Sequence, residues 1–238
     1  MIPWLHPTLL AFPDTATALD EPDGLLAAGG DLSTQRLLEA YRHGIFPWFS
    51  DDDPILWWSP NPRCVLLPDQ VHISRSMRKH INKGDYRVTF DTAFNEVIRA
   101  CASTREATTG TWISVDMQKA YCELHQQGHA HSVEVWENQQ LIGGLYGLGI
   151  GKLFFGESMF SRQKNASKIA FIALCQQLEK WGYPLIDCQV HNSHLESLGA
   201  RNIPRNEFID YIRHYIDSKT SHDWRFDSEK VILNSESG

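Results

Sequence analysis

The stretch AHSVEVWENQQLIGGLYGLGIGKLFFGESMF, residues 130–160, predicts the centre of the fold. Apolar and polar side chains alternate over residues 130–137, as they do in a strand with one buried face. Two further apolar runs, at residues 139–150 and 152–160, follow after short turns. Because strands joined by short turns pair antiparallel, the stretch predicts a three-stranded antiparallel meander.

Helix and strand patterns flank this meander on both sides. The longest helical pattern, residues 165–182, begins at a capping residue, Asn165 or Ser167, and ends at Gly182. The spacing of the apolar residues and the length of each segment identify the other elements. These are strands at residues 86–91 and 184–190 and helices at residues 92–103, 114–128 and 205–216.

The first third of the chain is rich in loops and aromatic residues and contains one clear helical pattern. Asp31 or Ser33 is its N-cap, and Tyr41 lies on its apolar side. From about residue 86, strand and helix patterns alternate along the chain. We therefore expect an α+β protein with a small N-terminal α+β domain at residues 1–64. The second domain, residues 65–238, is expected to contain a mixed, largely antiparallel sheet.

The composition is typical of a soluble globular protein, with 42% hydrophobic and 21% charged residues. Five widely spaced cysteines, an odd number without a C-x-x-C pair, indicate a reducing compartment rather than a disulfide framework. The first residues lack the basic region of a signal peptide, and no apolar run reaches the roughly 18 residues of a membrane span. We expect a cytoplasmic protein that has no membrane partner.

Three histidines lie close together in the sequence. His125, His129 and His131 fall across a predicted helix end, a glycine and a strand start. No cysteine or carboxylate completes an evident ligand set beside them. We therefore expect no metal site.

Basic residues cluster in one segment of this acidic protein, whose formal net charge is −7. If residues 72–83 form a helix, Met77 and Ile81 face inward and the basic side chains face outward. Such a helix is either a solvated surface or a phosphate-binding patch, and the pattern alone leaves both open. The basic side chains are Arg75, Arg78, Lys79 and Lys83.

A carboxylate and an amide lie inside the strand predicted at residues 184–190. Because side chains alternate along a strand, Asp187 and Gln189 share one face. Buried polar groups without partners are costly, so these two either line a wet cleft or satisfy each other. A polar strand end is the plainer interpretation. Cys188 points to the other face, where a buried, inert thiol is expected.

Several longer motifs together resemble one known family. In order they are GLLAAGGDLS, AYRHGIFPWF, PILWWSPNPR, GTWIS, GHAHSVEVW, FFGESMFS, NASK, LIDCQ and SLGARNIPR. The chain resembles the leucyl/phenylalanyl-tRNA–protein transferases of bacteria over residues 21–205. The resemblance implies transfer of leucine or phenylalanine, and also methionine, from aminoacyl-tRNA to an acceptor protein whose N-terminal residue is Arg or Lys. It implies no cofactor, a monomer, and a product marked for degradation by the N-end rule.

The order of elements after residue 86 also resembles the acyl-CoA N-acetyltransferase (GNAT-like) fold. Members of that fold hold the pyrophosphate of acetyl-CoA in a glycine-rich loop before a helix. The corresponding loop here, SRQKNASK, contains no glycine. We therefore expect a GNAT-like domain that does not use acetyl-CoA.

The resemblance also implies roles for individual residues. Gln189 would hydrogen-bond the attacking amine, Asp187 would orient it or take the proton, and Glu157 would face the cationic acceptor. Trp48 and Trp112 would hold the 3′ end of the tRNA, and the basic helix its phosphates. The pocket for the donor amino acid would be formed by Leu145, Phe154, Gly156, Ile169, Phe171, Leu174 and Ile186.

Three other functions are compatible with parts of the sequence. The first is an aminoacyltransferase that acts on cell-wall precursor peptides. The second is a non-catalytic RNA-binding module that uses the basic helix and the tryptophans. The third is an acetyltransferase, which the glycine-free loop disfavours.

Overall fold

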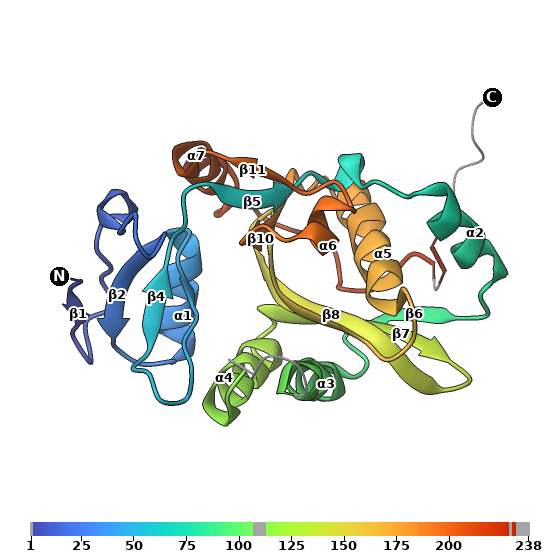
Figure 1. The fold of residues 1–238 in the computed structure, drawn as a ribbon, viewed down its shortest axis with the longest axis horizontal. Helices are drawn as coiled ribbons and strands as arrows, with labels where there is room; N and C mark the ends of the chain where they lie inside the picture. Colours follow the sequence, from blue (N-terminus) through green and yellow to red (C-terminus); the bar gives the residue numbers. More distant parts are fainter. Residues whose placement is uncertain (1, 107–112, 229, 232–238) are drawn as a thin grey trace.

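The computed structural model describes residues 2–106, 113–228, 230 and 231 of the 238-residue chain. They form an α+β fold with two sheets, as predicted from the sequence. Figure 1 shows the smaller sheet and its helix at one end of the molecule and the larger sheet, with helices on both faces, filling the rest. No helix of the described ranges is both long and apolar enough to cross a bilayer.

The smaller sheet has the strand order β1-β2-β4-β3 and belongs to the first 58 residues. Helix α1 is capped by Ser33, whose side chain accepts a hydrogen bond from the backbone N–H of Arg36. Trp57 is fully buried and donates its indole N–H to the carbonyl of Gly29, while Trp58 is partly exposed. The elements are β1 (Trp4–Leu5), β2 (Leu25–Gly29), α1 (Thr34–Arg42), β3 (Phe46–Pro47) and β4 (Leu56–Trp58).

The larger sheet has the strand order β11-β5-β10-β9-β8-β7-β6, and among these described strands only β9 and β10 pair in parallel. The predicted meander is confirmed as its centre, since β7, β8 and β9 pair antiparallel in sequence order. The strands are β5 (Arg63–Leu66), β6 (Arg87–Phe90), β7 (Ala130–Glu137), β8 (Gln140–Ile150), β9 (Leu153–Ser161), β10 (Leu185–Gln189) and β11 (Arg201–Ile203).

Helices cover both faces of this sheet, which gives two hydrophobic cores. Helices α3 and α4 lie on one face and α5 on the other (Figure 1). Helix α5 is buried on most sides, which explains the continuous apolar run at residues 169–175. The remaining helices are α2 (Arg75–Lys83), α3 (Phe94–Glu106), α4 (Val115–Gln126), α5 (Ala166–Lys180), α6 (Ser193–Glu196) and α7 (Arg205–Tyr215), with 3-10 turns at Thr15–Thr17 and Pro68–Gln70.

Strands β5 and β11 are not among the elements predicted from the sequence. Both are short, and neither has a clear alternation of apolar and polar residues. Strand β5 nevertheless lies between β10 and β11, so the chain enters the larger sheet at Arg63. The proposed domain boundary after residue 64 falls within this strand.

Candidate active site

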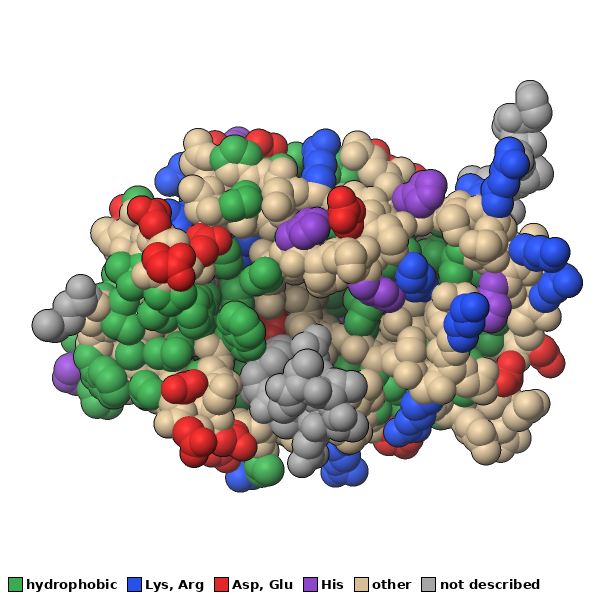
Figure 2. Space-filling model, viewed as in Figure 1, with side chains coloured by type: hydrophobic (Ala, Val, Ile, Leu, Met, Phe, Trp, Pro, Cys, Tyr) green, Lys and Arg blue, Asp and Glu red, His purple; other side chains and the backbone are tan. Residues whose placement is uncertain are grey.

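A cavity opens where strands β9 and β10 part. Their parallel pairing runs from Leu185 and Leu153 to Asp187 and Phe155 and goes no further. Beyond that point the two strands form opposite walls of a cavity of about 740 Å³. Figure 2 shows the surface hollowed near the middle of this face, with hydrophobic side chains gathered beside the hollow on the N-terminal side.

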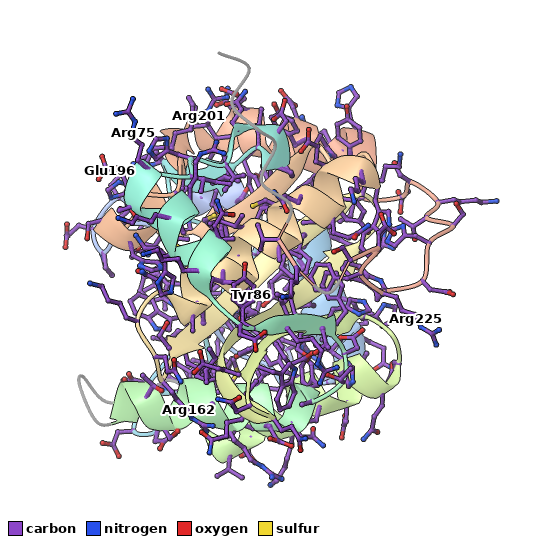
Figure 3. All side chains as sticks on the ribbon, turned by 90° about the vertical axis from the view of Figure 1, so that its right-hand side faces the viewer. Arg75, Tyr86, Arg162, Glu196, Arg201 and Arg225 are labelled. Carbon is purple, nitrogen blue, oxygen red and sulfur yellow. The ribbon has the colours of Figure 1, made fainter. Side chains whose placement is uncertain are left out.

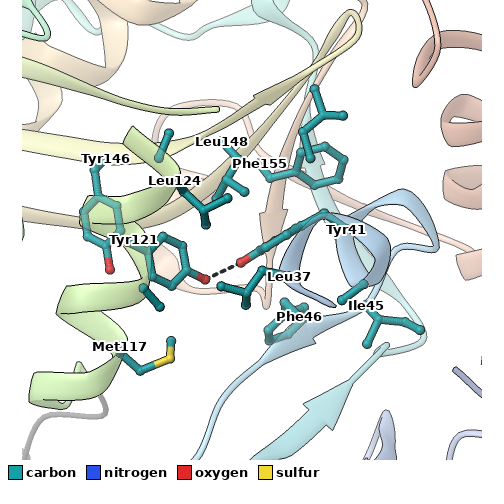
Figure 4. Packing of buried hydrophobic residues seen from close by; sticks show 14 of the residues in the cluster. Leu37, Tyr41, Ile45, Phe46, Met117, Tyr121, Leu124, Tyr146, Leu148 and Phe155 are labelled. Atoms are coloured by element: carbon teal, nitrogen blue, oxygen red, sulfur yellow. Dashed lines mark hydrogen bonds between the residues drawn. The ribbon is translucent and has the colours of Figure 1, made fainter. Parts of the chain in front are cut away.

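Glu157 lies in the wall of this cavity and is buried among hydroxyl groups. Tyr41 of α1 donates to its Oε1 at 2.6 Å, and Tyr121 of α4 donates to its Oε2 at 2.9 Å. The two tyrosine oxygens are themselves 2.5 Å apart, as the dashed line in Figure 4 marks. Helices from both parts of the molecule therefore meet at one carboxyl group.

Burial raises the pKa of Glu157 to about 8, although the hydrogen bonds from the two tyrosines lower it; the charge of Asp187 raises it further. This carboxyl group therefore keeps its proton to a higher pH than an exposed glutamate does.

Gln189 reaches Glu157 because the strand alternation breaks. A bulge shifts the β10–β5 register between Asp187 and Gln189, and Gln189 has φ +61°. Its side-chain Nε2 donates to Oε1 of Glu157 at 2.6 Å. The structure thus places the amide of Gln189 beside Glu157 rather than beside the side chain of Asp187.

Asp187 is fully buried and is paired with Arg63 of β5. The guanidinium donates from Nε to Oδ1 at 2.8 Å and from Nη2 to Oδ2 at 2.7 Å. Oδ1 also accepts the backbone N–H of Gln189 at 2.9 Å. Asp187 therefore contacts the main chain of Gln189, whose side chain points to Glu157.

Six of the seven residues expected to form the donor pocket line the cavity: Leu145, Phe154, Gly156, Phe171, Leu174 and Ile186. They come from β8, β9, α5 and β10. The seventh, Ile169, is also on α5 and packs in the same hydrophobic core as five of these residues, but it does not line the cavity. The helix turns Ile169 away because residues 171 and 174 share a face that residue 169 does not.

Trp48 follows β3 and lines the same cavity with 45% of its surface exposed. Its carbonyl accepts the indole N–H of Trp58 at 2.6 Å, and the two rings are 5.6 Å apart. Trp58 thus supports Trp48 while Trp57 is core, as their opposite orientations in a strand predict. Trp112 lies outside the described residues.

The basic helix is present but shorter than predicted. It begins at Arg75 rather than at residue 72, because Ser74 caps it by accepting the backbone N–H of Met77. Met77 and Ile81 are buried, as expected. The basic residues, which do not line the cavity in the described structure, are Arg75, Arg78, Lys79 and Lys83.

Two of the three histidines of residues 125–131 lie beside one carboxylate. His131 bonds Asp91 through Nδ1 at 2.7 Å, and Nδ1 of His125 lies 3.9 Å from Oδ1 of Asp91. His125 also contacts the carbonyl of Ala130 at 2.8 Å. Within the described ranges, no group of three or more His, Cys, Asp or Glu side chains is arranged to hold a metal ion. Cys188 is buried, and the pKa of its thiol is well above the usual value because of its contact with Cys64 and its burial.

Sequence reasoning missed three residues of this site: Tyr41, Tyr121 and Arg63. Tyr41 was expected on the apolar face of its helix, but its hydroxyl contacts Glu157, which lies 116 positions further along the chain. Arg63 precedes the apolar run of β5, where a basic residue usually marks a strand end. A buried acid such as Asp187 requires a cationic partner, but the sequence does not reveal which residue it is.

Comparisons with known proteins agree with the motifs. Residues 65–213 match the leucyl/phenylalanyl-tRNA–protein transferase family, and residues 30–61 match the N-terminal domain of the same family. The protein of that name from Stutzerimonas stutzeri is 58% identical over 225 residues, 94% of this chain and all of that protein. The one from Cellvibrio japonicus is 59% identical over 217 residues, 91% of this chain and 92% of that protein.

A solved structure of a conserved protein of unknown function from Bacteroides thetaiotaomicron superposes with a TM-score of 0.43 and 13% identity. It covers 64% of this chain and 55% of that one, and this similarity is too low to carry an argument. The family assignment rests instead on the matched ranges and the high identity over most of the chain. This chain belongs to the leucyl/phenylalanyl-tRNA–protein transferase family.

Proposed function

We propose that this protein transfers a leucyl or phenylalanyl group, and also a methionyl group, from its tRNA to the N-terminal amine of an acceptor protein. The observation that carries this proposal is the contact between Gln189 and Glu157 beside an apolar cavity. The site combines polar groups that can hydrogen-bond an amine with a pocket that fits an uncharged side chain.

The reaction needs no energy source, because an ester is exchanged for a peptide bond. The acceptor nitrogen attacks the ester carbonyl, a C–N bond forms, and the C–O bond to the tRNA 3′ end breaks. The amine loses one proton and the released ribose hydroxyl gains one. Since an α-amine has a pKa near 7.7–8.0, about a tenth of it is already neutral at pH 7. Holding the two reactants together can then supply roughly 7–11 kcal/mol of the barrier reduction.

We assign the amide of Gln189 to the attacking amine and Glu157 to the acceptor residue. The amide oxygen of Gln189 can accept a hydrogen from the amine, because its nitrogen is engaged by Glu157. Glu157 ionises readily near pH 8, and a cationic acceptor residue, Arg or Lys, would favour its charged form. This charge preference supports acceptors that begin with Arg or Lys.

The apolar wall of the cavity is assigned to the donor side chain. The wall includes the side chains of Phe154, Phe171 and Leu174, which offer only carbon atoms to the donor. Such a wall forms no hydrogen bonds by which one apolar amino acid could be selected over another. Because one methylene in such a pocket is worth about 1–3 kcal/mol, Leu, Phe and Met are all expected to bind. Charged donors would be excluded, since their burial without a partner is costly.

The donor tRNA is assigned to two surfaces. Trp48, at the cavity, would stack on the terminal base, an interaction worth about 1–3 kcal/mol. The basic face of α2 would contact phosphates of the acceptor stem without reading sequence. Figure 3 shows Arg75, at the start of this helix, projecting from the surface.

The larger sheet also supports the GNAT-like assignment, because its strands part beside the cavity after a long antiparallel hairpin. We propose that it is a GNAT-like domain adapted to aminoacyl-tRNA. The protein is proposed to act as a monomer in the cytoplasm and to mark its products for degradation.

Transfer of labelled leucine from charged tRNA tests this proposal. Two acceptor proteins that differ only in an N-terminal Arg or Ala are compared. We expect transfer to the Arg protein only. Binding of charged tRNA without transfer would contradict the proposal and favour a binding module. Transfer to a lysine side chain of a cell-wall peptide, but not to the Arg protein, would favour the cell-wall class of enzyme.

A further inference from the structure

Arg63 is one of the largest fully buried side chains of the described structure, yet it belongs to no role assigned above. Its two hydrogen bonds to Asp187, at 2.8 and 2.7 Å, form a parallel fork. The guanidinium lies 4.8 Å from the ring centre of Phe46 and 4.6 Å from that of Phe208. Such contacts stabilise a desolvated cation.

The residues around Arg63 come from three separate parts of the chain. Phe46 belongs to the smaller sheet, Phe208 to helix α7, and Asp187 to β10. Arg63 itself is the first residue of β5, the strand by which the chain enters the larger sheet. The pair is therefore fixed from several directions, and neither side chain is exposed to water.

The oxygens of Asp187 are already occupied. Oδ1 accepts hydrogens from Nε of Arg63 and from the backbone of Gln189, and Oδ2 accepts from Nη2 of Arg63. The side chain of Asp187 is therefore committed to hydrogen bonds within the protein. Asp187 lies at the cavity wall, and its side chain bonds the peptide N–H of Gln189 there.

That N–H belongs to a residue in an unfavourable backbone conformation. Gln189 has φ +61°, which non-glycine residues adopt at a cost. The hydrogen bond from its N–H to Asp187 offsets this cost and fixes the bulge. The bulge in turn directs the side chain of Gln189 toward Glu157.

We infer that Arg63 is a positioning residue for the transfer reaction: by its fork to Asp187 it holds the bulge that presents Gln189, and Asp187 takes no proton in the reaction. The inference rests on the proposed function, since it concerns the site proposed for aminoacyl transfer. It makes the planar shape of the guanidinium essential, because a lysine ammonium keeps the charge but cannot form the fork.

The test compares wild type with the single variants Arg63→Gln and Asp187→Asn and the double variant that combines them. Each is assayed for kcat and for KM toward leucyl-tRNA between pH 6 and 9. We expect each single substitution to lower kcat at least 100-fold, because it leaves one partner of a buried pair without its counterpart. The double variant has no carboxylate but can again pair amide with amide. It is expected to regain kcat to within about tenfold of wild type, with the pH profile unchanged in shape.

A folded double variant that is as inactive as Asp187→Asn would overturn the inference, because it would show that the carboxylate itself is needed. Arg63→Lys gives an independent result if the double variant does not fold. It is expected to lower kcat at least 30-fold with KM for leucyl-tRNA within about threefold, and wild-type kcat would overturn the inference.

The matched control is Arg36→Lys. Arg36 is also fully buried and paired with a carboxylate, Asp31. It lies on α1, beside the smaller sheet, and does not line the cavity. Its substitution is expected to lower the melting temperature and leave kcat within about twofold. Absence of transfer by wild type would instead count against the proposed function itself.

Discussion

At the scale of single residues, the unusual feature of this protein is a buried carboxyl group whose pKa is raised. Glu157 has its pKa raised to about 8 by burial, and it contacts Tyr41, Tyr121 and Gln189. Perturbed acids of this kind cluster at functional sites. These polar groups can be buried together because they hydrogen-bond one another.

Glu157 is expected to make stability depend on pH. Its ordinary pKa is 4.5, so between about pH 4.5 and 8 the folded protein binds one proton more than the unfolded chain. The free energy of unfolding should therefore fall as pH rises through this range, by at most about 1.4 kcal/mol per pH unit, and level off above it. Glu157→Gln, which is always neutral, should remove the part of this dependence that Glu157 contributes.

Urea unfolding at pH 5, 6.5 and 8 measures this effect. A smaller slope remains in Glu157→Gln, because burial also raises the pKa of Glu134. The exposed Glu123→Gln serves as the control and should behave as wild type. Equal slopes in wild type and Glu157→Gln would show that Glu157 is ionised in the folded protein.

Gln189→Ala is expected to lower kcat by about 10²–10⁴, the range found for groups that assist proton transfer. The alanine cannot hydrogen-bond the amine and leaves Oε1 of Glu157 with one donor fewer. Steady-state transfer of leucine to an Arg protein measures the effect. Gln118→Ala, an amide of α4 that bonds the carbonyl of Ile113, is the comparison and should keep wild-type kcat. Similar kcat values for both variants would remove Gln189 from the reaction.

At the scale of elements, the close approach of β8 and α5 depends on glycine. A Cβ on Gly143 would overlap the Cβ of Ala166 and press on the backbone N of Ser167, at 3.1 Å. Ser167 lines the cavity, so the spacing of this strand and helix also sets the cavity wall. Close packing of this kind tolerates little added volume.

Gly143→Ala is therefore expected to destabilise the protein by about 1–3 kcal/mol and to raise KM for leucyl-tRNA. Gly128→Ala is the control. Gly128 has φ +78° but no atom within 4 Å of an added Cβ, so only backbone strain of about 1–2 kcal/mol is expected there. Denaturant unfolding and KM measured on both variants separate strain from packing. A KM that changes equally in both would refute the packing argument.

The elements themselves were mostly predictable. The sequence predicts the meander, the long helix α5 and the helices around them. Each is long enough for the spacing of its apolar residues and its capping residues to be recognised. Strands β5 and β11 were missed because a three- or four-residue strand has too few positions to show a period. The bulge at Gln189 was also missed, because strict alternation assumes a regular strand.

At the scale of the whole molecule, charge is unevenly distributed. The protein has a formal net charge of −7, yet α2, which leads to the edge strand β6, presents a basic face. In Figure 2, Lys and Arg side chains are prominent on the side of the hollow opposite the hydrophobic N-terminal surface. An acidic protein that binds RNA needs such a local positive surface to overcome the overall repulsion.

The double variant Lys79→Glu/Lys83→Glu is expected to weaken binding of leucyl-tRNA by at least tenfold at low salt. The dependence of log affinity on log salt should become shallower by about 0.7–0.9 for each phosphate that the variant no longer neutralises. Lys119→Glu on α4, also exposed, is the control and should bind as wild type. Binding that is unaffected by the α2 variant would mean that this face is only a solvated surface.

The sequence by itself determined the α+β class, the order of most elements and the family, and it pointed to the two acids and the amide that the fold brings together. Local patterns and long motifs carry this information, because the spacing of apolar residues, the helix caps and the turn residues depend on residues that are close together in the sequence. Only the tertiary structure decided that Arg63 pairs with Asp187, that Tyr41 and Tyr121 enclose Glu157, and that Ile169 faces the core. These contacts join positions as far as 124 residues apart. Their partners are chosen by burial, which brings together whichever groups satisfy one another's charge and hydrogen bonds, and no local pattern records that choice.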